Sequence, residues 1–128
     1  MNLYIEKSIL ERLLFSKLSH KQELLNTLEN ELKKANRLFF STHSLEVLLS
    51  DLKDRTKKHQ ILLDLQILFE KFLPLNEEDI ILSIKLEEEL GLTNCLDLAI
   101  CLNHKMDYII TEDKDLKRQK LVKVKLVE

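Results

Sequence analysis

The sequence has few residues that turn a chain sharply, with one glycine and one proline among 128 residues. It also has no tryptophan. Tight hairpins depend on glycine and proline, so their scarcity argues against a β-sandwich or barrel and favours long helices. The unbroken apolar runs are too short to cross a bilayer. Charged residues also interrupt the first segment that could form the core of a signal peptide: Glu6, Lys7, Glu11 and Arg12. We therefore expect no membrane association.

Cysteine is scarce as well, and the charge is nearly balanced. Two cysteines, Cys95 and Cys101, are too few for a disulfide scaffold, so a cytoplasmic location is expected. A formal net charge of -2 excludes a protein that coats nucleic acid by bulk charge, so any such contact needs a local patch. With 45% hydrophobic and 33% charged residues, the chain is expected to fold as a single domain over residues 1–128.

Hydrophobic spacing alternates between the period of a strand and that of a helix along the chain. The short apolar or alternating segments predict strands at 2–5, 38–41, 72–75, 108–111 and 122–126. Helical spacing predicts helices near 8–16, 19–32, 42–52, 61–69, 76–90 and 94–104, with a charged connection over 53–59. Strands separated by helices need crossover connections, so we expect an α/β fold. It has three layers (α/β/α) around a mostly parallel sheet of four to five short strands.

Several residues are candidates for helix ends. Ser19, followed by Gln22, is typical of a capping box, and Thr42 or Ser44 is expected to cap the helix after the second strand. Three further positions complete these expectations: Asn76 as a cap, Gly91 as a left-handed C-terminal residue, and Thr93 or Asn94 as the start of the next helix.

Acidic side chains follow the ends of several predicted strands. Glu6 follows the first strand, Glu46 lies in the helical turn after the second, and Asp113 follows the strand at 108–111. Asn94 and Asp97 lie in the opening turn of the helix before that strand. Any one such acid is explained by the helix dipole or by ordinary surface charge. Together, like charges in one cleft cost stability unless a cation binds between them. Oxygen ligands without histidine or cysteine select Mg²⁺ or Mn²⁺.

Three segments of the chain match one family pattern in order and spacing. They are LYIEKSIL at 3–10, FSTHSLEVL at 40–48 and the stretch 91–116, which contains NCLDLAIC and DYIITED. In this pattern the sequence resembles the PIN domain, the fold of the VapC-type toxin ribonucleases. The match departs from the family at two acidic positions, where this chain has Glu6 and Asn94 instead of aspartates. Asp97 lies three residues beyond Asn94, on the same helix face, and would restore a carboxylate.

The resemblance implies a metal-dependent endoribonuclease that hydrolyses RNA phosphodiester bonds with Mg²⁺ or Mn²⁺. It assigns metal ligation to Glu6 and Asp113, with Glu46 orienting a water or acting as a second ligand. Asn94 would position the metal or the phosphate, aided by Asp97 as a further ligand. Ser8 and Thr111 would hydrogen-bond to the ligands from behind.

An acidic cleft repels RNA, so cations are expected at its rim. Lys7 neighbours Glu6, and the basic residues after Asp113 are the expected RNA contacts: Lys114, Lys117, Arg118 and Lys120. Ordinary surface charge explains them equally well. The four histidines show no metal-ligand spacing, although His43 is close to Glu46.

The resemblance also implies an antitoxin partner and a homodimer. Two alternatives remain open. One is a catalytically degenerate PIN-like module that binds RNA or a protein, and the other is an unrelated α/β scaffold whose acids are incidental.

Overall fold

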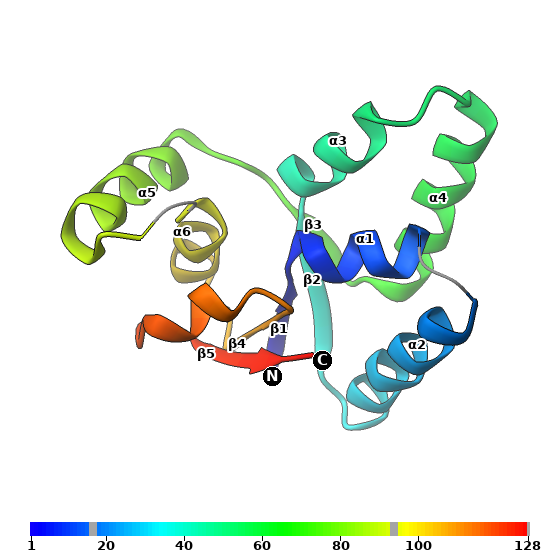
Figure 1. Cartoon of the computed structure of the whole chain (residues 1–128), viewed down its shortest axis with the longest axis horizontal. Coiled ribbons are helices and arrows are strands. Elements are labelled where there is room, and N and C mark those ends of the chain that lie inside the picture. Colours follow the sequence, from blue (N-terminus) through cyan, green and yellow to red (C-terminus); the bar gives the residue numbers. More distant parts are fainter. Residues whose placement is uncertain (16–17, 93–94, 128) are drawn as a thin grey trace.

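A computed structural model describes residues 1–15, 18–92 and 95–127 (Figure 1). The chain forms a five-stranded sheet of order β3-β2-β1-β4-β5 in which every pairing is parallel. The elements run as β1 (Asn2–Ile5), α1 (Lys7–Phe15), α2 (Leu18–Lys33), β2 (Arg37–Ser41), α3 (Thr42–Ser50), α4 (Arg55–Leu68), β3 (Lys71–Leu73), α5 (Glu77–Leu90), α6 (Leu96–Asn103), β4 (Tyr108–Thr111), the 3₁₀ helix η1 (Lys114–Arg118) and β5 (Lys123–Leu126).

Helices cover both faces of the sheet, so the predicted three-layer α/β/α architecture is confirmed (Figure 1). Successive strand residues point to opposite faces. Leu3 and Ile5 of β1 therefore join one core with helices α1 to α4, whereas Tyr4 joins the other core with α5 and α6. Within α2, Leu24 and Leu28 are buried in the first of these cores.

Two helices begin at residues other than those expected. Ser41, the last residue of β2, caps α3 because its hydroxyl accepts a 3.0 Å hydrogen bond from the Ser44 amide. The expected caps Thr42 and Ser44 lie inside the helix. The segment 53–59, expected as a charged connection, contains the start of α4, where the Asp54 side chain accepts from the amides of the first turn. The Asp54 cap stabilises the start of the helix, so the helix forms although the residues that follow are charged and exposed.

The remaining helix ends are closer to expectation. Asn76 caps α5, and Gly91 ends it in the left-handed conformation with φ 66°. Helix α2 begins at Leu18, so Ser19 lies in its first turn and is not the expected cap. The proposed starts of the following helix, Thr93 and Asn94, lie outside the described residues; Cys95 precedes α6.

The register of the sheet brings three strand ends to one edge. Tyr4 pairs with Phe39 of β2 and with Ile109 of β4. The residues that follow β1 and β4 therefore lie level with the end of β2, and the Glu6 amide donates to the Ile110 carbonyl at 3.0 Å. This edge carries the candidate site. None of the described helices is long and apolar enough to cross a membrane.

Phe40 is the aromatic centre of the core that faces α1 to α4. It is 0% exposed, and its ring centroid lies 4.7 Å from that of Phe69 and 4.4 Å from that of Phe72. We expect Phe40→Ala to lower the free energy of unfolding by about 3–5 kcal/mol, because the cavity cannot collapse between two fixed rings. Ile67→Ala, at a position 86% exposed, is the control and should cost less than about 0.5 kcal/mol. Urea unfolding of both variants measures this, and equal losses would contradict it.

Candidate active site

A pocket of about 390 Å³ opens at the carboxyl edge of the sheet. Three of the carboxylates expected from the sequence line it: Glu6, Asp97 and Asp113. Glu6 directly follows β1, and Asp97 lies in the first turn of α6. Asp113 lies two residues beyond the end of β4. The remaining lining residues are Lys7, Ser8, Glu11, His43, Ser44, Val47, Leu96 and Leu116. The parallel pairing of the strands thus brings Glu6 and Asp113 to one pocket, although they are more than 100 residues apart in the sequence.

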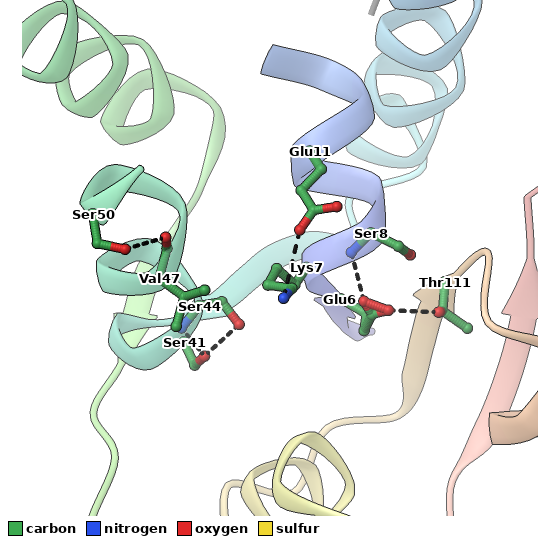
Figure 2. A network of polar contacts seen from close by, with 9 residues as sticks. All are labelled: Glu6, Lys7, Ser8, Glu11, Ser41, Ser44, Val47, Ser50 and Thr111. Atoms are coloured by element: carbon green, nitrogen blue, oxygen red, sulfur yellow. Dashed lines mark hydrogen bonds and ion pairs between the residues drawn. The ribbon is translucent and has the colours of Figure 1, made fainter. Parts of the chain in front are cut away.

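Glu6 is almost completely buried, with 7% of its surface exposed. The Ser8 amide donates a 2.6 Å hydrogen bond to its Oε2, and the Thr111 hydroxyl donates a 3.0 Å bond to its Oε1 (Figure 2). Thr111 Oγ1 in turn accepts from the Asp113 amide at 2.9 Å. The Ser8 hydroxyl accepts from the Glu112 amide at 3.2 Å. Both expected supporting residues therefore contact this network, although Ser8 reaches Glu6 through its backbone.

Asp97 is held from below by a buried tyrosine. The Tyr4 hydroxyl donates a 2.5 Å hydrogen bond to Asp97 Oδ1. Asp113 is more exposed and caps η1, because its Oδ1 accepts from the Asp115 amide at 2.9 Å. In the described part of the chain, the Oδ2 atoms of Asp97 and Asp113 form no hydrogen bond, so each aspartate keeps one oxygen for a ligand.

Burial makes the ionised carboxylates unfavourable. Burial raises the pKa of Glu6, and the nearby Asp97 charge adds to the rise despite the Ser8 and Thr111 hydrogen bonds. Burial also raises the pKa of Asp97, and the Tyr4 hydrogen bond and the nearby Lys7 charge oppose that rise. Two such carboxylates in one pocket repel each other, and a bound cation would relieve that repulsion.

The nearest cations leave the three carboxylates without a close ion pair. Lys7 lies 3.5 Å from Glu11 on α1 (Figure 2). Over the described ranges, no ion pair within 4.0 Å includes Glu6, Asp97 or Asp113. The three carboxylates therefore have no direct ion-pair partner among the described lysines and arginines, although the Lys7 charge acts on Asp97 from a greater distance.

One expected site residue, Glu46, is not brought into the pocket. Glu46 is exposed on α3 and is not among the lining residues, because that helix presents His43, Ser44 and Val47 instead. Asn94 lies outside the described residues.

Two other residues at the site were not among the sequence-based candidates, Glu11 and Tyr4. Glu11 lines the pocket beside Lys7, and the four-residue spacing of this pair on a helix was the available signal. For Tyr4, the sequence indicated only that it lies in a buried strand, and no pattern indicated its contact with the site.

The expected RNA contacts lie beside Asp113. Lys114, Lys117, Arg118 and Lys120 are all exposed. Arg118 lies 3.5 Å from Asp115 and lines a neighbouring pocket of about 260 Å³, which shares Asp113 and Leu116 with the first. Arg118 therefore places positive charge in the pocket that adjoins the acidic one.

The oxygen donors of the pocket would suit a hydrated divalent cation better than a fully protein-enclosed ion. Among the residues described, no three His, Cys, Asp or Glu side chains are grouped closely enough to hold a metal by themselves. Mg²⁺ commonly keeps several waters and uses one or two carboxylates together with substrate phosphate. The free oxygens of Asp97 and Asp113, next to Glu6, meet that smaller requirement.

Comparisons with known proteins show the fold. No family model matches the sequence, and no curated protein matches it. Among solved structures, the chain is similar to a chain in the crystal structure of VapBC2 from Rickettsia felis bound to a DNA fragment from their promoter. The TM-score is 0.73, the identity is 14%, and the match covers 100% of both chains. The fold is therefore PIN-like, as the sequence resemblance predicted.

The raised pKa of Glu6 predicts a pH effect that the Glu6→Gln variant removes. Between its ordinary value of 4.5 and the raised value, folded Glu6 binds more protons than unfolded Glu6. Stability therefore falls as pH rises through that window, by at most about 1.4 kcal/mol for each pH unit. We expect the free energy of unfolding of the unsubstituted protein, minus that of Glu6→Gln, to decrease over this window. Urea titrations in EDTA measure the difference, and a rising difference would contradict the burial argument.

Proposed function

We propose that this chain is a metal-dependent endoribonuclease that hydrolyses RNA phosphodiester bonds. The observation that carries the proposal is the convergence of Glu6, Asp97 and Asp113 on one pocket without a close ion pair to any described lysine or arginine. The PIN-like fold supports it, because sites in parallel sheets form at this edge.

The three carboxylates would share in binding a hydrated Mg²⁺ or Mn²⁺, with water and the substrate phosphate completing its ligands. When bound, the cation supplies an acidified water and neutralises charge on the phosphate. Asp97 and Asp113 would contribute their Oδ2 atoms, and Glu6 would add its remaining lone pairs while Ser8 and Thr111 fix its orientation. We assign no ligand role to Glu46, whose exposed side chain lies outside the pocket lining. Asn94 remains a proposed phosphate-positioning residue.

The substrate would enter along the basic rim. Lys7 and His43 lie in the pocket itself, and the Lys7 charge offsets part of its negative charge. The exposed cations beside Asp113 would contact the flanking phosphates: Lys114, Lys117, Arg118 and Lys120. Phosphate contacts position a nucleic acid without reading its sequence.

The proposed setting is a toxin–antitoxin pair in the cytoplasm. The similar structure from Rickettsia felis is a VapBC2 assembly bound to promoter DNA. We extend this to propose an antitoxin as the partner of the present chain. The buried, unpaired cysteines Cys95 and Cys101 agree with a reducing compartment.

A catalytically degenerate module that binds RNA or protein is the second candidate. Two observations favour it: no three potential ligands are grouped closely in the described part of the chain, and both Glu6 oxygens already accept hydrogen bonds. Such a protein would bind RNA through the same rim and leave it intact.

Removing one pocket carboxylate should abolish most of the activity. We expect the purified protein to cleave single-stranded RNA with Mn²⁺ and not with EDTA. Asp97→Asn and Asp113→Asn should each reduce the rate by about 100-fold or more, the size typical of losing one preorganised electrostatic group. Quantitative cleavage of an end-labelled RNA measures the rates.

Asp64→Asn is the matched control for that experiment. Asp64 is an exposed aspartate on α4, where it accepts a hydrogen bond from Gln60, and it does not line the pocket. It should cleave at the unsubstituted rate. RNA binding without cleavage, together with no rise in melting temperature on adding Mn²⁺, would reject the nuclease in favour of the degenerate module.

A homodimer is also part of the proposal, and helix α5 offers the surface. Ile80, Ile81 and Ile84 form an exposed apolar strip on this helix. We expect the protein to sediment as a dimer and Ile81→Lys to sediment as a monomer, because a buried lysine opposes association. Ile67→Lys, at an exposed isoleucine on α4, should leave the dimer intact. Dimers of Ile81→Lys in sedimentation velocity would exclude this surface.

A further inference from the structure

The Tyr4 hydroxyl lies beneath the floor of the pocket. Tyr4 is 0% exposed, and its ring packs in the core between the sheet and α6. Its hydroxyl donates to Asp97 Oδ1 at 2.5 Å, across 93 residues of sequence. A phenylalanine would fill the same space in the core. The hydroxyl of this buried tyrosine therefore has a role beyond packing, because it bonds to a carboxylate of the pocket.

A second polar group lies near the Tyr4 hydroxyl, on the side of β2. Ser41, at the end of β2, lies beside this hydroxyl. The Ser41 hydroxyl in turn donates to Ser44 Oγ at 2.9 Å, and Ser44 lines the pocket on the side of α3. Ser41 and Ser44 thus place their hydroxyls on the β2 and α3 side of Tyr4.

The hydroxyl has little freedom to move. A tyrosine side chain has only two rotatable bonds that move its ring, and close packing on a central strand holds both. An ionised carboxylate in a desolvated place keeps the orientation in which it accepts its strongest hydrogen bond. With Oδ1 committed to Tyr4, Oδ2 is the Asp97 oxygen left for a ligand.

We propose that Tyr4 is a positioning residue that holds the Asp97 carboxylate in the pocket and thereby sets the affinity of the site for a divalent cation. The effect of Tyr4 on cation affinity rests on the proposed function, whereas its effect on the orientation of Asp97 does not. Tyr4 touches no reacting atom in this assignment.

The test compares Tyr4→Phe with the unsubstituted protein by two measurements. In a crystal structure of the metal-free variant, the Asp97 carboxylate should leave its present position. Mn²⁺ binding, followed by water proton relaxation, should weaken by about 10- to 100-fold, the usual effect of removing a residue that supports a metal ligand. Tyr108→Phe is the matched control, because Tyr108 is half-buried over Lys123, away from the pocket, and should leave both measurements unchanged.

A double variant separates positioning from a general loss of structure. Asp97→Asn alone gives the full loss expected without the carboxylate. If Tyr4 acts through Asp97, adding Tyr4→Phe to Asp97→Asn should weaken Mn²⁺ binding no further. Additive losses would overturn the inference. Should Tyr4→Phe fail to fold, Asp97→Glu, which shifts the carboxylate away from the hydroxyl, should weaken binding to a similar extent, and unchanged binding would overturn it.

The outcomes distinguish this inference from the proposed function. An Asp97 carboxylate that stays in place in Tyr4→Phe overturns the positioning role, even if the unsubstituted protein binds Mn²⁺ and cleaves RNA. Absence of Mn²⁺ binding by the unsubstituted protein rejects the nuclease and the part of the inference that concerns affinity. The crystal structure of Tyr4→Phe then decides the orientation.

Discussion

The parallel pairing of β1 with β2 on one side and β4 on the other is the constraint on which the rest of the structure depends. Backbone hydrogen bonds on both edges of β1 fix its register, so Glu6 emerges level with the ends of both neighbours. A shift of one residue would turn Tyr4 and Ile5 to the opposite faces and break both cores. The position of the acidic pocket therefore follows from the packing of apolar residues.

This arrangement places charge where water is scarce. Glu6 and Asp97 lose hydration, which is why burial is the largest cause of the raised pKa of each. The fold offsets part of that cost with directed donors: the Ser8 amide and the Thr111 hydroxyl for Glu6, and Tyr4 for Asp97. What remains is negative charge that the pocket compensates only in part, and under the proposed function a bound cation would relieve it.

Much of the fold could be predicted because local signals and tertiary packing agree. Gly91 ends α5 because no other residue in the segment takes φ 66° without strain, and Asn76 begins it with a short polar side chain. The predictions failed where several residues offered similar signals. Ser41, Thr42 and Ser44 can all cap a helix, and the choice of Ser41 depends on where β2 stops pairing. In the same way, Asp54 starts α4 within a segment whose charges resemble a loop.

The sequence by itself determined the alternation of strands and helices, the parallel sheet and the presence of acids after the strands, because these depend on periodicity and chain connectivity. Only the tertiary structure decided which acids meet. The rotation of α3 presents His43 and Ser44 to the pocket and leaves Glu46 outside its lining, whereas α6 presents Asp97. No local sequence pattern could predict the hydrogen bond between Tyr4 and Asp97. These residues are far apart in the sequence, and their side chains approach each other only when α6 packs on the sheet.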